Sequence, residues 1–190
     1  MSGDSPADLA HQPSPIAERI RRGEQERLLA DRVQGRELPD VELTVASHHA
    51  TVPLRQHVFG LTVIYFLPGE AEGKAWLAGD IPTPDAAQHR GYIRRHDQFA
   101  ALNAKVMGVA SQSGEELLRM GQYLRPNHLL LADVEMRLGS ALDLPTDEHG
   151  LYRRIALLTD GTRIKRMFPA VERTDASASA RQVLSWLEAQ

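Results

Sequence analysis

The chain has 190 residues and contains no cysteine. This absence excludes disulfides, thiolate metal sites and cysteine nucleophiles. Long hydrophobic runs are also missing, because no apolar stretch approaches the roughly 18 residues that a membrane span needs. The N-terminus lacks the basic and apolar regions of a signal peptide. These absences predict a cytoplasmic protein that does not use the membrane as a partner.

The net charge is small as well, because 22 basic and 25 acidic residues nearly balance. The formal net charge is -3 and the isoelectric point is about 6.2, so no broad positive field attracts phosphates. We therefore expect no nucleic-acid partner, and any basic groove has to be local. The length suits one domain with a sizeable core.

The N-terminal part differs in composition from the rest. Residues 1–15 are rich in Ser, Pro, Asp and Ala, which predicts a disordered tail. Apolar residues at near-helical spacing predict a helical extension over 16–35, packed on the domain or on a second subunit. The domain itself is expected over 36–190.

Strand and helix patterns alternate through this domain. Strands are predicted from β-branched or alternating runs at 41–46, 51–58, 61–67, 104–110 and 128–133. Helices are predicted at 84–102, 113–124, 134–144 and 178–189, with a β-hairpin over 154–168 that turns at Asp160-Gly161. This order is typical of an α/β fold with parallel strands in its sheet.

Five segments, taken in order, resemble a known family. They are "LPDVELTV", "LTVIYFLPG", "KVMGVASQSGEELLRM", "LLLADVEMRLGSALDLPT" and "RIALLTDGTRIKRMF". Together they resemble the alkyl hydroperoxide reductase/thiol-specific antioxidant family, nearest its bacterioferritin-comigratory-protein branch, over residues 36–189. The resemblance implies a thioredoxin-like fold of the peroxiredoxin type, with a central mixed sheet, an N-terminal β-hairpin and flanking helices. It also implies a homodimer.

The family's active-site motif is present without its thiols. Setting Thr83-Pro84 on the family's Thr-Pro dipeptide places Ala86 on the peroxidatic cysteine and Gly91 on the resolving cysteine. Counting back from the next strand without a gap places Asp85 on the peroxidatic cysteine instead. Neither register supplies a nucleophilic sulfur, so the resemblance implies a peroxiredoxin-like protein that is not a thiol peroxidase.

Polar side chains remain around the missing cysteine. Asp85, His89 and Tyr92 share one face of the predicted helix and together form a candidate proton-transfer set. A solvated helix face with one buried tyrosine would show the same spacing. The resemblance places an arginine beside the site, and strand alternation lets one of Arg153 and Arg154 point inward, with Arg154 preferred.

The predicted substrate site adds four residues to this set. Thr83 suits a helix N-cap on structural grounds, and in the functional interpretation its hydroxyl binds an oxygen-containing group. Trp76 would supply an apolar wall, and Ala86 and Arg153 complete the lining. His89 and His96 lie about 10 Å apart along the helix, too far to share one metal ion. We therefore predict no metal and no cofactor.

Three functions are compatible with these residues. The first is a cofactor-free enzyme that acts on a small organic substrate by acid–base chemistry, in a step of specialised metabolism. The second is a non-catalytic binding or regulatory subunit that uses the N-terminal helix as a partner surface. The third is an oxidoreductase that uses a bound metal or haem in place of sulfur.

Overall fold

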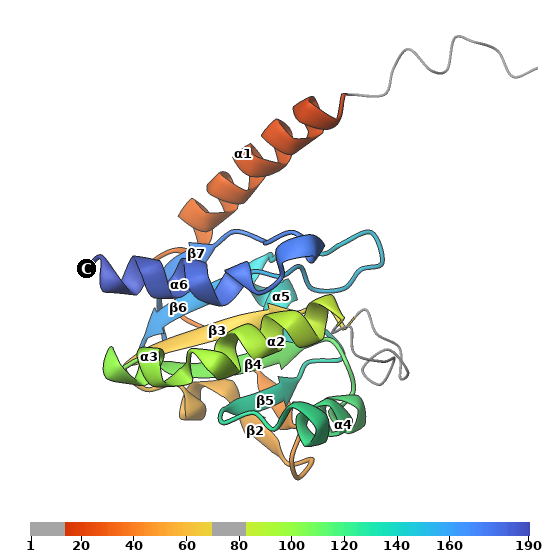
Figure 1. Ribbon diagram of the computed structural model, residues 1–190, viewed down its shortest axis with the longest axis vertical. Helices are drawn as coiled ribbons and strands as arrows, with labels where there is room; N and C mark the ends of the chain where they lie inside the picture. Colours follow the sequence, from red (N-terminus) through yellow and green to blue (C-terminus); the bar gives the residue numbers. More distant parts are fainter. Residues whose placement is uncertain (1–13, 70–82) are drawn as a thin grey trace, which may run out of the picture.

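The computed structural model describes residues 14–69 and 83–190, and within these ranges a seven-stranded mixed sheet forms the centre (Figure 1). The strand order is β2-β1-β5-β4-β3-β6-β7. The strands are β1 Glu42–Val45, β2 Thr51–Pro53, β3 Leu61–Leu67, β4 Lys105–Ala110, β5 Leu129–Ala132, β6 Ala156–Asp160 and β7 Arg163–Phe168. The three central strands β3, β4 and β5 run parallel, and every other pairing is antiparallel.

The central strand β3 is buried on both faces, as its continuous apolar run predicts. Its register with β4 places Tyr65 opposite Gly108. A Cβ at Gly108 would lie 2.7 Å from the Tyr65 ring, so glycine is what lets this large side chain lie flat over the neighbouring strand.

Helices cover both faces of the sheet. One face carries α2 Pro84–Arg94, α3 His96–Ala101, α4 Gly114–Leu124 and α6 Ala178–Glu188. The other face carries α5 Arg137–Leu142, the 3-10 helix η2 Leu54–His57 and the C-terminal end of α1 Pro15–Val33. Each layer encloses its own apolar cluster.

Helix α1 is continuous and leaves the domain at an angle (Figure 1). Its last turns are anchored, because Leu29 and Val33 are buried against the domain. Ile16 and Ile20 in the N-terminal half of the helix are exposed, and so is Leu28 next to the buried Leu29. The helix therefore buries one apolar side in its last turns and leaves other apolar residues uncovered.

Three predicted elements have different bounds in the structure. The helix expected over 84–102 divides into α2 and α3 at Arg95, and the bend allows Phe99 to be fully buried with its ring stacked on Tyr92. The strand expected over 51–58 ends at Pro53, which has no N–H for a ladder and passes into η2.

The helix expected over 134–144 spans only α5. Met136 has a left-handed backbone conformation with φ of 52°, so helical geometry cannot begin before Arg137. Asp133 stabilises the start of α5, because its carboxylate accepts the backbone N–H groups of Arg137 and Leu138, both at 2.9 Å.

The order and directions of these elements confirm the predicted fold class, with the N-terminal β1–β2 hairpin at one edge of the sheet. None of the helices within the described ranges has the length and apolar character needed to cross a bilayer. Residues 1–13, most of the predicted tail, lie outside those ranges.

Candidate functional site

The candidate site is built where β3 ends and α2 begins. Ser111 donates a hydrogen bond of 2.6 Å to the carbonyl of Pro68, which fixes the turn after β3. Gly69 follows with φ of 78°, and a Cβ there would collide with the Gln112 side chain. The Gly69 N–H is thereby aimed at Asp85 and donates to Oδ2 at 3.0 Å.

Asp85 forms a buried ion pair with Arg154. The guanidinium Nη2 lies 2.6 Å from Oδ1, and the side chains are 1% and 4% exposed. Both carboxylate oxygens therefore have a donor, one from a backbone amide and one from a cation. Two charges can be buried at low cost only when they are paired and hydrogen-bonded to each other. This contact therefore holds α2 against the segment that enters β6.

Thr83 and Ala86 have mainly structural contacts. Thr83 is the N-cap of α2, and its Oγ1 accepts the Ala86 N–H at 3.2 Å. Ala86 is 2% exposed and belongs to the apolar cluster beneath the helix. Its methyl group therefore packs in the core, whereas Asp85 beside it faces Arg154. Trp76, predicted to supply an apolar wall, lies outside the described residues.

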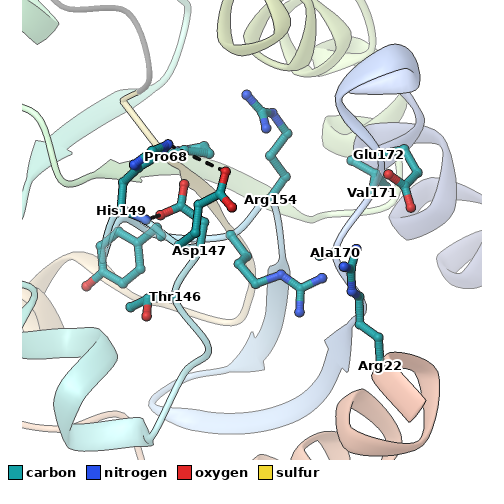
Figure 2. Close-up of a pocket in the computed structure, with 12 residues that line it drawn as sticks. Arg22, Pro68, Thr146, Asp147, His149, Arg154, Ala170, Val171 and Glu172 are labelled. Carbon is teal, nitrogen blue, oxygen red and sulfur yellow. Dashed lines mark hydrogen bonds and ion pairs between the residues drawn. The ribbon is translucent and has the colours of Figure 1, made fainter. Parts of the chain in front are cut away.

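The two candidate arginines point to different partners. Arg154 contacts Asp85, whereas Arg153 pairs with Glu26 of α1 at 2.6 Å. Both side chains line a groove of about 430 Å³ (Figure 2). The groove thus extends from α1 to the buried ion pair.

Figure 2 shows the two walls of this groove. The loop 146–149 forms one wall, and residues 170–172 form the other, with Arg22 of α1 at its edge. The remaining lining residues are Pro68, Tyr152, Arg153 and Arg154. Charges of both signs lie along it, because the acidic side chains Asp147, Glu148 and Glu172 line the groove together with its arginines.

His89 belongs to a separate buried cluster. Its Nδ1 is hydrogen-bonded to the hydroxyl of Tyr65, which also contacts Nε2 of His128 at 2.8 Å. His128 Nδ1 lies 3.2 Å from Oδ1 of Asn127. The cluster connects α2, β3 and the residue before β5 inside the core.

Hydrogen-bond accounting assigns the tautomers of this cluster. With Asn127 Oδ1 as the acceptor, His128 carries its proton on Nδ1, and its Nε2 accepts the Tyr65 hydroxyl proton. The Tyr65 oxygen then accepts from His89 Nδ1–H. Within residues 14–69 and 83–190, Nε2 of His89 has no hydrogen-bond partner. The lone pair of this nitrogen is therefore buried without a donor.

Burial keeps all three groups neutral. It lowers the pKa of His89 to about 3, with a further contribution from His128. Burial, followed by the charge of His96, lowers the pKa of His128 to about 4. Burial and the neighbouring Tyr92 raise the pKa of the Tyr65 hydroxyl well above its usual value. These groups are poor proton donors and acceptors near neutral pH.

The predicted stripe of Asp85, His89 and Tyr92 is divided among three environments. The carboxylate faces Arg154, the imidazole faces Tyr65, and the Tyr92 hydroxyl lies 2.8 Å from that of Ser179. Burial raises the pKa of the Tyr92 hydroxyl, although the Ser179 contact opposes the shift. All three side chains lie on α2, but their contacts bring them to three different parts of the core and not to a common cavity.

Sequence reasoning missed Tyr65, His128 and Gly69. Tyr65 lies in a strand predicted to be buried on both faces. Because a buried phenol requires a hydrogen-bond partner, this burial alone could have predicted a polar contact for Tyr65. The positive φ of Gly69 is a common property of glycine in a turn, but its contact with Asp85 has no local signature. The described residues contain no group of three or more His, Asp or Glu side chains able to hold a metal.

Comparisons with known proteins find similarity to members of the family that the sequence pattern resembles. Peroxiredoxin Bcp of Bacillus subtilis (strain 168) is 27% identical over 157 residues, which cover 79% of this chain and 93% of the relative. No family model matches the chain.

Solved structures give the same fold. Peroxidoxin BcpB from Mycobacterium tuberculosis superposes with a TM-score of 0.65 and 16% identity, over 82% of this chain and 96% of that chain. Peroxiredoxin Q of Xanthomonas campestris superposes with a TM-score of 0.64 and 21% identity, over 84% and 98%. The resemblance to peroxiredoxins is thereby confirmed, and the chain has no cysteine with which to reproduce their chemistry.

The buried ion pair predicts a strong asymmetry between its single and double variants. Asp85→Asn leaves the Arg154 charge uncompensated in the core, and we expect it to lower the free energy of unfolding by about 3–5 kcal/mol. Asp85→Leu combined with Arg154→Met should cost less than Asp85→Asn, because no unpaired charge remains. Urea denaturation measures both.

The matched control for this prediction is Asp175→Asn, which breaks an ion pair of the same 2.6 Å length between two exposed side chains. We expect a loss of about 1 kcal/mol or less. Equal losses for Asp85→Asn and Asp175→Asn would contradict a structural role for the buried pair.

The His89 pKa predicts an acid-sensitive core. The folded-state pKa of about 3 lies below the ordinary value near 6.5, so protonation favours the unfolded chain. The contribution of neutral His89 to the free energy of unfolding is fully present above pH 6.5, and it falls as the pH decreases from there toward 3. Between pH 7 and pH 5 the wild type should lose about 2 kcal/mol more unfolding free energy than His89→Gln, which cannot titrate. Parallel pH profiles from urea denaturation would refute this assignment.

Proposed function

We propose that this cysteine-free chain with the fold of the bacterioferritin-comigratory and Q-type peroxiredoxins is a non-catalytic binding protein. Its ligand is a small polar organic molecule in the groove beside Arg154. The observation that carries the proposal is the Asp85 carboxylate, which stands where one register of the resemblance places the reactive cysteine. Both of its oxygens are committed to donors within the fold.

An aspartate in place of the reactive cysteine keeps the negative charge of a thiolate site and removes its reactivity. A thiolate beside an arginine attacks the O–O bond of a peroxide with its sulfur lone pair. A carboxylate beside the same arginine keeps the negative charge, but it offers no sulfur to be oxidised. Asp85 therefore stabilises the fold through its ion pair with Arg154 and supports no turnover.

The groove supplies the binding surface. Its volume of about 430 Å³ is within the range of small-molecule sites. Arg22 and Arg153 offer donors to an anionic group, whereas Asp147 and Glu172 can accept from a cationic or hydroxyl group. A molecule with both kinds of polar group suits this lining better than a hydrocarbon does.

A second candidate function is acid–base catalysis on a small organic substrate, in a step of specialised metabolism. One observation favours it: the groove is also lined by His149 and Glu148, whose Nε2 and Oε1 atoms lie 3.6 Å apart, and an imidazole beside a carboxylate suits proton transfer. In this alternative Asp85 would act as a base, which requires its release from Arg154.

Self-association stays a prediction of the family resemblance, and a cytoplasmic location stays a prediction of the sequence. The exposed apolar residues Ile16, Ile20 and Leu28 on α1 support association of two copies, because they leave hydrophobic surface on a projecting helix. The mass of the particle in solution, from light scattering, would exclude the dimer if it equals one chain.

Thermal unfolding with a panel of small carboxylates, amines and amino acids tests the binding function. We expect at least one compound to raise Tm, because a ligand that binds only the folded state stabilises it. Arg22→Ala and Glu172→Ala should abolish the shift, whereas Arg119→Ala, at an exposed position on α4 away from the groove, should keep it.

Chemical analysis of the same mixtures separates the two functions. A binding protein returns each compound unchanged. Conversion by the wild type but not by Asp85→Asn would contradict the non-catalytic proposal and establish the enzyme in its place. A panel that leaves Tm unchanged would count against both.

A further inference from the structure

A second groove lies on the helical face of the molecule, where α2 and α6 pack side by side (Figure 1). It has a volume of about 540 Å³. Its described lining comes from the C-terminal part of α2, from the start of α3 and from the N-terminal part of α6, namely Ala87, Arg90, Gly91, Arg94, Arg95, Gln98, Ser177 and Arg181.

Gly91 sets the close approach of the two helices. A Cβ at this position would lie 3.2 Å from the carbonyl oxygen of Ser177 and 3.6 Å from the Cβ of Ala180. The glycine thus lets the backbone of α2 come close to the start of α6. Arginines from both sides are consequently held around one depression.

Four arginines line this depression, and contacts position three of them. Arg95 donates to the carbonyl of Gly91 at 3.2 Å, and Arg90 lies over the ring of Tyr123 with 5.8 Å to its centroid. Arg181 donates to Ser177 Oγ at 3.0 Å. These contacts restrict the arginine side chains and so reduce the side-chain entropy that ligand binding would otherwise remove.

Negative charge does not balance these arginines. Among the described residues, the lining contains no Asp or Glu. Asp175 at the edge pairs with Arg181, which leaves an excess of three positive charges at the groove. The chain as a whole carries a formal charge of -3, so this concentration of positive charge is local.

We propose that the α2–α6 groove binds a small molecule that carries at least two phosphate groups. Guanidinium groups match phosphate oxygens in charge and in their forked donor geometry. Several arginines around one depression fit a diphosphate or triphosphate better than a single carboxylate. The confined volume and the acidic character of the whole chain disfavour an extended nucleic acid. This binding does not depend on the groove beside Arg154.

Titration calorimetry of the full-length protein with inorganic tripolyphosphate, at physiological ionic strength, tests the proposal. We expect saturable binding, and Arg94→Glu should weaken it at least about tenfold because a repulsive charge replaces a donor. Arg119→Glu on α4 is the matched control. It changes the net charge by the same amount outside the groove and should leave binding within about twofold.

An amide chemical-shift map of the wild-type protein with tripolyphosphate gives an independent readout. Shifts confined to the C-terminal part of α2 and to residues 177–181 would support the site even if a variant folds poorly. Absence of binding, shifts elsewhere, or equal weakening by Arg94→Glu and Arg119→Glu would overturn it, because each shows either no affinity or general charge attraction.

Discussion

The buried contact between Asp85 and Arg154 is the interaction on which the site depends. It joins three segments that are distant in sequence: the turn at Gly69 after β3, the first turn of α2 and the residues before β6. Removal of either charge would leave the other in a low-dielectric environment without a partner. The pair therefore fixes the position of α2 over the sheet, and the groove beside Arg154 takes its shape from that position.

The different sides of helix α2 contact different parts of the molecule. Asp85 faces the ion pair, His89 faces Tyr65 in the core, and Arg94 lies at the groove next to α6. The apolar residues of the same helix complete the cluster beneath it. One helix thus combines a charge-paired corner, a neutral buried polar cluster and a basic surface groove. This separation is why the polar residues of α2 do not form one catalytic set.

Much of the fold could be predicted from local pattern, because β-branched runs, a capping box and a turn dipeptide each act within a few residues. The capping box at Ser113 and Glu116, for example, marks the start of the helix predicted at 113–124. Side-chain partners were harder to predict, since spacing on a helix shows which residues share a face but not what that face meets. Asp85 and His89 are four apart, yet their partners come from β3 and from the segment before β6.

In the proposed site, Asp85 occupies the position of a reactive thiolate beside Arg154. A comparison of Asp85→Cys with Ala86→Cys tests this placement, by following thiol ionisation with pH and oxidation by hydrogen peroxide. We expect a lowered thiol pKa and rapid oxidation for the cysteine at position 85, because Arg154 would stabilise its thiolate. The cysteine at position 86 should stay protonated and slow to react in the apolar cluster. A reactive thiol at position 86 and an inert one at position 85 would show that Ala86, and not Asp85, stands at the thiolate position.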